Sequence, residues 1–243
     1  MENNIYLGDC LEVMKDIGDK TIDLIFCDMP YGTTKNKWDT IIPLPQLWEH
    51  YERIIKDKGC ICLTAQSPFD KVLGCSNMKL FRYEWIWVKN KSTGFLNSKR
   101  MPLKTHENIL IFYKRLPTYN PQKTFNNKPM NAVRKTDKIV STDNYNEFKR
   151  TGCEGGDTSR YPKDVINISV INNDNPLKYH PTQKPIELPE YFIKTYTNEG
   201  DLVLDNCFGS GSTIKACIKL KRKYIGIEIN EEYYNKLDAV INA

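Results

Sequence analysis

The sequence predicts an α/β fold: a mixed, mostly parallel sheet with helices on both faces, interrupted by an irregular basic insertion. Residues 22–27, Ile-Asp-Leu-Ile-Phe-Cys, form a short apolar run bounded by an acidic residue, as strands of a buried parallel sheet do. Residues 201–228 hold two further apolar runs with a helical pattern between them, which indicates a βαβ unit. The 243 residues suit one domain of this class with an insertion rather than two independent domains.

The first elements are marked by capping residues and by periodicity. Asp9 is expected to cap a short helix over residues 10–17 that leads into the first buried strand. Apolar residues at helical spacing predict a second helix over residues 47–55, and Gly59 is expected to end it. The apolar run at residues 60–64 then predicts a second buried strand.

The middle elements are a short helix and a pair of strands. Pro68 is expected to open the helix. Residues 83–89 and 108–113 predict two strands that pair antiparallel at the edge of the sheet. Trp85 and Trp87 share one face of the first of these strands, and large aromatic residues in such a position belong more often to the core than to a base-stacking surface.

The last elements belong to the βαβ unit and its flanks. A helix is expected over residues 186–196, before the strand that ends at Asp205. Ser212 or Thr213 is expected to cap the following helix, which continues to residue 220. The next strand ends at Glu228, and a helix over residues 231–241 follows.

Residues 28–31, Asp-Met-Pro-Tyr, follow the first buried strand directly and form the first candidate site. Ligands of open α/β sheets bind at the carboxyl ends of strands, where Asp28 and Tyr31 are expected. An exocyclic amine on a base is a poor nucleophile until acceptors draw on its hydrogens, and Asp28 and a turn carbonyl supply such acceptors. Tyr31 can stack on a base turned out of the helix. The alternative is an ordinary strand-to-turn exit.

Residues 205–213, Asp-Asn-Cys-Phe-Gly-Ser-Gly-Ser-Thr, form a glycine-bearing turn, and Glu228 ends the next strand about 20 residues on. This layout binds nucleoside-containing cofactors, because glycines admit close backbone approach and the carboxylate accepts ribose hydroxyls. NAD is disfavoured because the turn lacks a third glycine and because Asp205 would repel a pyrophosphate. Asp205 suits a cationic end, such as the amino group of a methionine moiety. The alternative is a tight turn in a cofactor-free sheet.

Four segments together resemble one family, the DNA methyltransferases that methylate amino groups. Residues 28–31 are similar to the family's Asp-Pro-Pro-Tyr catalytic motif, with Met29 as a departure that chiefly shapes the turn. Residues 208–211, Phe-Gly-Ser-Gly, are similar to its Phe-x-Gly-x-Gly cofactor motif. Residues 179–185, Tyr-His-Pro-Thr-Gln-Lys-Pro, resemble a segment beside the cofactor's methionine end. Residues 7–10, Leu-Gly-Asp-Cys, resemble a segment that contacts its adenosine portion.

The order of these motifs is similar to that of the circularly permuted beta class. The resemblance implies a Rossmann-like class I methyltransferase fold, S-adenosyl-L-methionine as cofactor and double-stranded DNA as substrate. It implies three catalytic residues: Asp28, Pro30 and Tyr31. Lys184 would meet the cofactor's carboxylate, Asp205 its ammonium and Glu228 its ribose. The whole set implied to bind the cofactor is Asp9, Cys10, Asp28, Met29, Pro30, His180, Thr182, Lys184, Asp205, Phe208, Gly209, Ser210, Gly211, Ser212, Thr213 and Glu228.

The expected reaction is methyl transfer to the N6 amine of adenine by direct displacement after base flipping. Adenine is favoured because relatives acting on cytosine N4 usually carry serine where this chain has Asp28. N4-cytosine methylation remains the alternative, and a non-catalytic DNA-binding module is a weaker one that would not need Asp28 with Tyr31. Relatives acting on RNA or on a protein glutamine usually begin the motif with asparagine. No hydride-site constellation supports an NAD oxidoreductase.

Positive charge is concentrated in the middle of the chain. Residues 89–150 carry 14 lysines and arginines against 4 acidic residues, a local charge of +10, whereas the rest of the chain carries −5. Aromatic residues are interleaved with these charges, which suits phosphate contact with base stacking. Residues 1–113 and 172–243 are therefore expected to form one catalytic and cofactor-binding domain, and residues 114–171 an inserted target-recognition region. A polar loop at residues 32–39 is expected over the active site. His106 and Glu107 are expected to make only a local contact, with a weak role in positioning DNA.

Composition excludes several other classes. No apolar run reaches the roughly 20 residues of a membrane span, and the N-terminal residues are not those of a signal peptide. The 8 cysteines show no zinc spacing, so free thiols and no structural metal are expected. The protein is expected in the cytoplasm of a bacterium, or encoded by a phage, without membrane contact. A cognate restriction endonuclease is a possible partner, and a homodimer a possible assembly.

Overall fold

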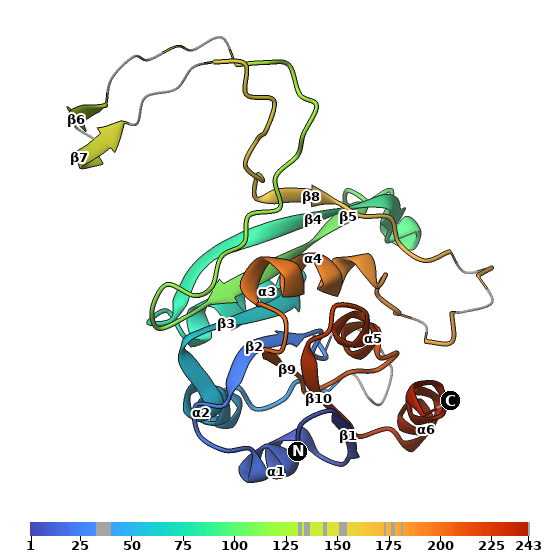
Figure 1. Ribbon diagram of the computed structural model, residues 1–243. Coiled ribbons are helices and arrows are strands. Elements are labelled where there is room, and N and C mark those ends of the chain that lie inside the picture. Colours follow the sequence, from blue (N-terminus) through green and yellow to red (C-terminus); the bar gives the residue numbers. More distant parts are fainter. Residues whose placement is uncertain are drawn as a thin grey trace. The chain divides into compact units, whose positions relative to one another are not determined.

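The computed structural model describes residues 1–32, 40–130, 133, 137–142, 145–150, 155–172, 174–175, 178–180 and 182–242 (Figure 1). The predicted loop at residues 32–39 therefore lies outside the described residues except for Gly32. The chain divides into two compact units. The first comprises Met1–Asn120 with Asp164–Ala243, and the second comprises Pro121–Lys163.

The described part of the first unit forms an eight-stranded mixed sheet with strand order β1-β10-β9-β2-β3-β5-β4-β8. Its strands are β1 (Asn4–Leu7), β2 (Ile22–Cys27), β3 (Ile55–Ala65), β4 (Phe81–Thr93), β5 (Lys104–Phe112), β8 (Val165–Asn167), β9 (Leu202–Asp205) and β10 (Lys223–Glu228). The five strands from β1 to β3 in this order are parallel, and β5 pairs antiparallel with both β3 and β4. The prediction of a mixed, mostly parallel sheet is confirmed.

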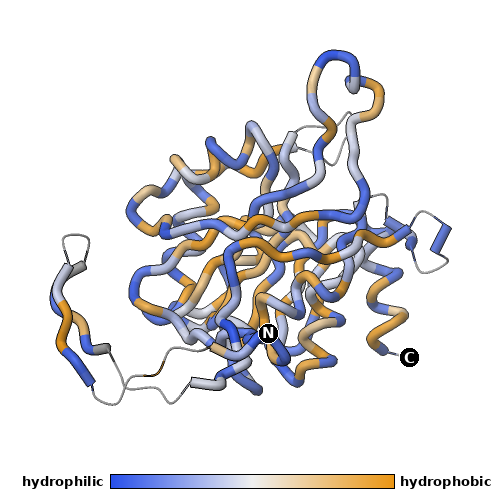
Figure 2. The backbone as a smooth tube through the Cα atoms, turned by 90° about the horizontal axis from the view of Figure 1, so that it is seen from above, coloured by the Kyte–Doolittle hydropathy of each residue, from blue (hydrophilic) through white to orange (hydrophobic). Residues whose placement is uncertain are grey.

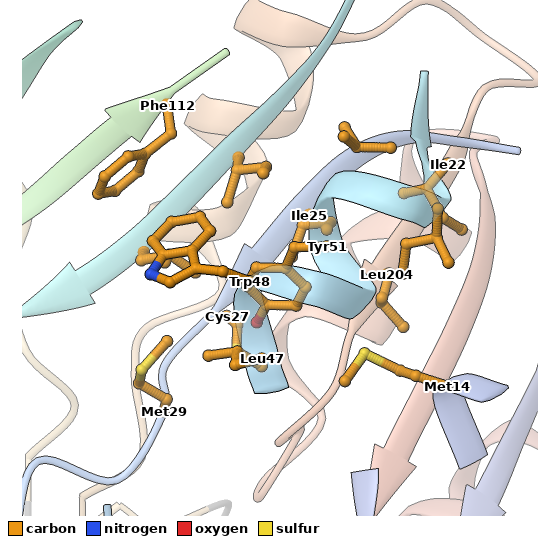
Figure 3. Close-up of a cluster of buried hydrophobic side chains, with 14 of the residues drawn as sticks. Met14, Ile22, Ile25, Cys27, Met29, Leu47, Trp48, Tyr51, Phe112 and Leu204 are labelled. Atoms are coloured by element: carbon orange, nitrogen blue, oxygen red, sulfur yellow. The ribbon is translucent and has the colours of Figure 1, made fainter. Parts of the chain in front are cut away.

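Six described helices cover both faces of this sheet, as predicted. They are α1 (Cys10–Val13), α2 (Leu44–Ile54), α3 (Phe69–Ser76), α4 (Glu187–Tyr196), α5 (Ser212–Lys219) and α6 (Glu231–Ile241). Side chains of α1, α2 and α3 join one core cluster, part of which Figure 3 shows, and those of α4, α5 and α6 join another. Figure 2 shows α6, next to the end marked C, alternating between hydrophobic and hydrophilic residues.

The alternation of side chains along β2 explains the two cores. Ile25 and Cys27 are buried in the cluster with α1, α2 and α3, whereas Leu24 and Phe26 are buried in the cluster with α4, α5 and α6. Successive strand residues point to opposite faces, so a strand between two helical layers must be apolar at nearly every position. The uninterrupted apolar run from residue 24 to residue 27 is the sequence signature of that position.

Several predicted boundaries are wrong. Helix α1 ends at Val13 and continues as a short 3₁₀ helix over Met14–Asp16. Helix α2 ends at Ile54, and Gly59 lies inside β3, where an added Cβ would stand 2.7 Å from the Ile55 side chain and 3.0 Å from the Asp23 carbonyl oxygen. Close packing rather than helix termination therefore requires this glycine.

The predicted antiparallel pair is present, but it is not the edge of the sheet. Strand β8 pairs in parallel with β4 and forms that edge. Trp85 and Trp87 are buried, as predicted, and the indole of Trp87 donates to the carbonyl oxygen of Ile168 just beyond β8. A three-residue strand within an irregular segment gives too short a pattern to recognise from sequence.

The second unit contains a hairpin of β6 (Lys138–Thr142) and β7 (Tyr145–Arg150), and an antiparallel bridge between Thr124 and Arg160. The sequence predicted no regular elements here. Ile139 is 75% exposed, so β6 lacks the buried face whose alternation identifies a strand.

The described cysteines are free thiols, and all of them except Cys75 and Cys207 are buried; Cys153 lies outside the described residues. No helix in the described part of the chain is both long and apolar enough to cross a bilayer.

Candidate active site

A cavity of about 920 Å³ opens at the carboxyl ends of β1, β2, β9 and β10 in the first unit. All the predicted site residues line it except Gly211. Segments that are far apart in the chain, near residues 9, 28, 182, 208 and 228, therefore meet in one space, as the sheet order requires. This is the position at which open α/β sheets bind their ligands.

Asp28 is held from three sides. Its Oδ1 accepts hydrogen bonds from the Tyr31 hydroxyl, at 2.6 Å, and from the Thr64 hydroxyl at the end of β3. Its Oδ2 lies 2.8 Å from Nζ of Lys184. The Tyr31 ring stacks on Phe69, the first residue of α3, with 5.7 Å between ring centroids. The turn after β2 therefore fixes a carboxylate rather than leaving it to solvent.

The neighbours of Asp28 determine its charge. Burial alone would raise the pKa of this carboxyl, but the Lys184 charge and hydrogen bonds from Lys184, Thr64 and Tyr31 lower it below its usual value. Burial and the nearby carboxylates raise the pKa of Tyr31, so its hydroxyl stays a donor. Burial favours a neutral Lys184, but Asp28 and Glu107 outweigh it and raise the pKa of Lys184. Asp28 and Lys184 are thus an ion pair.

Glu107 and Lys89 also line the cavity. The sequence predicted only a local contact for Glu107 and did not single out Lys89. Glu107 Oε2 lies 3.1 Å from Nζ of Lys184, and its Oε1 accepts from Lys89, which lies on β4. The rule that ligands meet the carboxyl ends of strands missed Glu107 because β5 is antiparallel and brings its amino end to the site. A buried acidic residue at the start of an apolar strand is the signal that could have found it.

Asp205 is a buried carboxyl without a compensating cation. It is 3% exposed and accepts a hydrogen bond from the backbone nitrogen of Cys207 at 3.1 Å. Burial raises the pKa of Asp205 to about 7, while hydrogen bonds from Thr213 and Cys207 act in the opposite direction. Within the described residues no lysine or arginine forms an ion pair with it. A cationic ligand would supply the missing charge.

Glu228 is oriented by backbone donors. Its Oε2 accepts from the nitrogen of Gly209 and its Oε1 from the nitrogen of Asn230, each at 2.8 Å. The backbone nitrogen of Ile229 is a third donor to this carboxylate. A carboxylate has about four acceptor positions, so about one remains for a ligand. Phe208 packs on Gly226 of β10, where an added Cβ would stand 2.9 Å from the Phe208 ring. The glycine turn and the carboxylate are thus fixed to the same strand.

Residues 178–180 and 182–185 are anchored on the glycine turn. The Tyr179 hydroxyl donates to the Ser210 carbonyl oxygen, and the Ser212 hydroxyl donates to the Lys184 carbonyl oxygen at 2.7 Å. The centroids of the His180 and Tyr233 rings lie 4.4 Å apart. The backbone nitrogen of Thr182 donates to Nδ1 of His180 at 3.2 Å. Burial lowers the pKa of His180. These contacts bring Lys184 to the cavity.

Two predicted details differ in the structure. The cap of α5 is Gly211, at φ 70°, and neither Ser212 nor Thr213 caps the helix with its side chain. An added Cβ on Gly211 would stand 2.4 Å from the Leu237 side chain, so the packing of α6 requires a glycine here. Asp9 caps α1 by accepting from the Leu11 nitrogen at 2.8 Å, as predicted, and also lines the cavity with Cys10.

The fold and the residues that line the cavity indicate an α/β protein whose site suits a nucleoside-containing cofactor with a cationic end. No group of three or more His, Cys, Asp or Glu side chains within the described ranges could hold a metal ion. A family model for DNA methylases matches residues 22–239, and the chain belongs to this family. The predicted family, methyl donor and enzyme class, an S-adenosylmethionine-dependent DNA methyltransferase, are confirmed.

Curated relatives are similar over nearly the whole chain. The type II methyltransferase M.HpaI of Haemophilus parainfluenzae is 29% identical, over 100% of this chain and 76% of its own length. The DNA adenine methyltransferase YhdJ of Escherichia coli is 29% identical, over 93% of this chain and 78% of its own. The type II methyltransferase M1.MboII of Moraxella bovis is 27% identical, over 99% of this chain and 96% of its own.

Solved structures share the fold. The complex of M1.HpyAVI with S-adenosylmethionine superposes with a TM-score of 0.67 at 24% identity, covering 99% of both chains. The PvuII DNA methyltransferase, described as cytosine-N4-specific, superposes with a TM-score of 0.66 at 17% identity, covering 96% of this chain and 84% of its own. The predicted fold class is confirmed.

Proposed function

We propose that this protein transfers a methyl group from S-adenosylmethionine to the N6 amine of adenine in double-stranded DNA. The observation that carries the proposal is a single cavity lined by Asp28 at the end of β2 and by Asp205 and Glu228 at the ends of β9 and β10. The cavity joins an acceptor for an exocyclic amine to groups suited to a cationic nucleoside. When bound, S-adenosylmethionine would supply a methyl group on a positively charged sulfur; transfer of this methyl group to an amine leaves the sulfur as an uncharged thioether.

The residues present fit this methyl donor. Asp205, a buried carboxyl without an ion-pair partner among the described residues, suits the ammonium of the methionine portion. Glu228 has an acceptor position for a ribose hydroxyl. Asp9, Cys10, Met29, Pro30, His180, Thr182, Phe208, Gly209, Ser210, Ser212 and Thr213 complete the lining proposed to hold it.

Asp28 is proposed to act on the target base. Its carboxylate accepts a hydrogen bond from the amine, which turns the nitrogen lone pair out of the ring plane and aims it at the methyl carbon. The proton that the amine loses leaves along this hydrogen bond. Pro30 fixes the turn, and Tyr31 supports the base by stacking after it leaves the helix. Positioning and electrostatics thus supply the catalysis without a nucleophilic side chain.

Adenine is favoured over cytosine on two grounds. First, the motif at residues 28–31 begins with aspartate, whereas family members that methylate cytosine N4 usually have serine at this position. Second, the relative YhdJ is named as a DNA adenine methyltransferase. To test this, the protein is incubated with methyl-labelled S-adenosylmethionine and unmethylated duplex DNA. The DNA is then digested to nucleosides, which are separated by chromatography. Label in N6-methyladenine supports the proposal, label in N4-methylcytosine assigns the other substrate, and no label with either base overturns it.

Asp28→Ala is expected to lose methyl transfer while retaining the fold and S-adenosylmethionine binding, because the amine loses its acceptor. Asp16→Ala, which changes an exposed aspartate outside the cavity, is the matched control. The measurement is the single-turnover rate together with the affinity for cofactor and DNA. If Asp28→Ala binds both and stays within about tenfold of the parent rate, a loss of only about 1.4 kcal/mol, the assigned role is wrong.

We further propose that residues 114–171 read the target sequence, supported by the positive charge of this part of the chain. The bacterial relatives include type II methyltransferases, which supports action in the bacterial cytoplasm and a cognate restriction endonuclease as a partner. A homodimer is proposed as the assembly, and its test is the molar mass in solution.

A further inference from the structure

Four charged side chains that line the cavity form a series of contacts in which the sign of the charge alternates. Asp28 contacts Lys184, Lys184 contacts Glu107, and Glu107 contacts Lys89. Their side chains are 26%, 13%, 9% and 12% exposed, respectively, so all four lie largely away from water. They come from separate parts of the chain: the turn after β2, the segment before α4, and the strands β5 and β4.

We propose that Lys184 and Glu107 are positioning residues for Asp28: Lys184 holds Oδ2 of the catalytic carboxylate, and Glu107 holds Lys184. This inference rests on the proposed function of Asp28. It gives Lys184 a different role from the one that the sequence resemblance implied, contact with the carboxylate of the cofactor.

The acceptor positions of Asp28 support this role. Oδ1 accepts from both Tyr31 and Thr64, which fills its two acceptor positions. Oδ2 lies against Lys184 alone among the described side chains, so one of its acceptor positions remains. The target amine therefore has one oxygen to approach, and the direction of that approach is set by where Lys184 holds the carboxylate.

Burial explains why Lys184 needs Glu107. A charge that is removed from water is unfavourable unless an opposite charge and hydrogen bonds compensate it. Lys184 has a carboxylate on each side, and the ring of Trp87 lies 6.0 Å from its Nζ. Glu107 Oε2 is buried, and it faces Lys184 at ion-pair distance without a well-aligned hydrogen bond. Attraction from two directions keeps the ammonium between the carboxylates.

The same arrangement controls the charge of Asp28. Of the groups around it, Lys184 lowers its proton affinity, with the hydroxyls of Thr64 and Tyr31. The other titratable groups near this end of the cavity are Cys27, Tyr31, Lys89, Glu107, Lys178, His180, Asp205, Cys207 and Glu228. Removing the Lys184 charge would leave Oδ2 of Asp28 without the cation that contacts it, while Tyr31 and Thr64 would still donate to Oδ1. Removing the Glu107 charge would leave Asp28 as the one carboxylate, among the described residues, that pairs with Lys184.

The two substitutions should therefore shift the pH dependence in opposite directions. Lys184→Met should lower the single-turnover rate at least tenfold and move the acidic limb of the rate profile to higher pH by about one unit or more. Glu107→Gln removes a negative charge near Asp28, so it should lower the rate and move that limb to lower pH. Lys184→Arg, which keeps the charge, should retain the parent limb. If Lys184 and Glu107 only stabilised the fold, both variants would react more slowly, but the acidic limbs of their pH–rate profiles would not move in opposite directions.

Cofactor affinity, measured by calorimetry, separates this role from the alternative. Lys184→Met should bind S-adenosylmethionine within about threefold of the parent, which also shows that the variant is folded. If its affinity falls more than tenfold while the acidic limb stays in place, Lys184 is a cofactor ligand and the inference is overturned. If Lys184→Met does not fold, the inference is overturned by a Glu107→Gln variant whose acidic limb moves to higher pH. Failure of the parent to transfer methyl groups would instead refute the proposed function.

Discussion

At the scale of single residues, the acidic side chains of this cavity behave differently because their neighbours differ. Asp28 and Asp205 both end or follow buried strands of the parallel sheet. The pKa of Asp28 is lowered because Lys184 and two hydroxyls outweigh burial, whereas burial dominates at Asp205 and raises its pKa to about 7. The first is a permanent acceptor, and the second changes charge near neutral pH.

Asp205 predicts a pH-dependent affinity for S-adenosylmethionine. A cationic ligand prefers the ionised carboxyl and lowers its pKa on binding, so affinity should increase by up to tenfold per pH unit as pH rises toward about 7, and then level off. It should decline again above about pH 8, where an α-amino group loses its proton. Calorimetry from about pH 5.5 to about pH 8.5 measures both limbs.

Asp205→Asn is the control for this prediction. It should remove the rising limb and weaken binding at neutral pH by about 1.5–3 kcal/mol, the range for a hydrogen bond to a charged group. An Asn variant that keeps the rising limb would assign that titration to another group, such as His180.

At the scale of elements, close contact between β10 and the glycine turn aligns the cofactor side of the cavity. Gly226 leaves room for Phe208 and for Ile214 of α5, since an added Cβ would stand 2.9 Å from Phe208 and 3.0 Å from Ile214. The Phe208 nitrogen also donates to the Ile227 carbonyl oxygen at 3.1 Å. The turn is thereby fixed against the strand that carries Glu228.

Gly226→Ala should destabilise the protein by about 1–3 kcal/mol, because the extra methyl group overpacks the core. It should also weaken cofactor binding by moving the Phe208 turn. Gly74→Ala is the matched control, since Gly74 lies in α3 and an added Cβ meets no atom within 4 Å. That change should stabilise the protein by about 0.4–1 kcal/mol. Denaturant unfolding measures both, and equal effects would contradict the packing argument.

At the scale of the whole molecule, positive charge is concentrated in the middle of the chain. Residues 89–150 carry a charge of +10, and the remainder carries −5. Phosphate contacts release counterions, so the salt dependence of DNA affinity counts the basic residues that touch the backbone. The charge distribution therefore gives the proposed target-recognition role a quantitative test.

Changing three basic residues of the second unit to glutamine, Lys123, Lys128 and Lys138, should weaken DNA binding and reduce the magnitude of the log–log salt slope. The expected reduction is about 0.9 for each phosphate that a lysine no longer neutralises. Affinity for S-adenosylmethionine without DNA should stay unchanged. The matched control changes three exposed lysines near the amino ends of parallel strands, opposite the cavity: Lys58, Lys79 and Lys221. Equal slopes for the two triple variants would assign DNA recognition to another part of the chain.

The sequence by itself determined the fold class and most of the cavity. A strand buried on both faces must be apolar throughout, and a turn that approaches a ligand needs small residues, so residues 22–31 and 202–213 were readable as strand and turn. The resemblance of four short motifs then predicted the family, because each motif carries chemistry at fixed spacing. The same local signals identified Asp28, Asp205 and Glu228 as strand-end carboxylates.

Only the tertiary structure decided which of these charges are paired. Lys184 and Glu107 lie 77 positions apart in the sequence, and Glu107 reaches the cavity because an antiparallel strand reverses its direction there. Gly59 likewise proved to be a packing position for Ile55 rather than a helix end, and an added Cβ on Gly211 would collide with Leu237. Spacing along the chain predicts what a segment forms by itself, whereas partners brought together by sheet order appear only once the sheet is assembled.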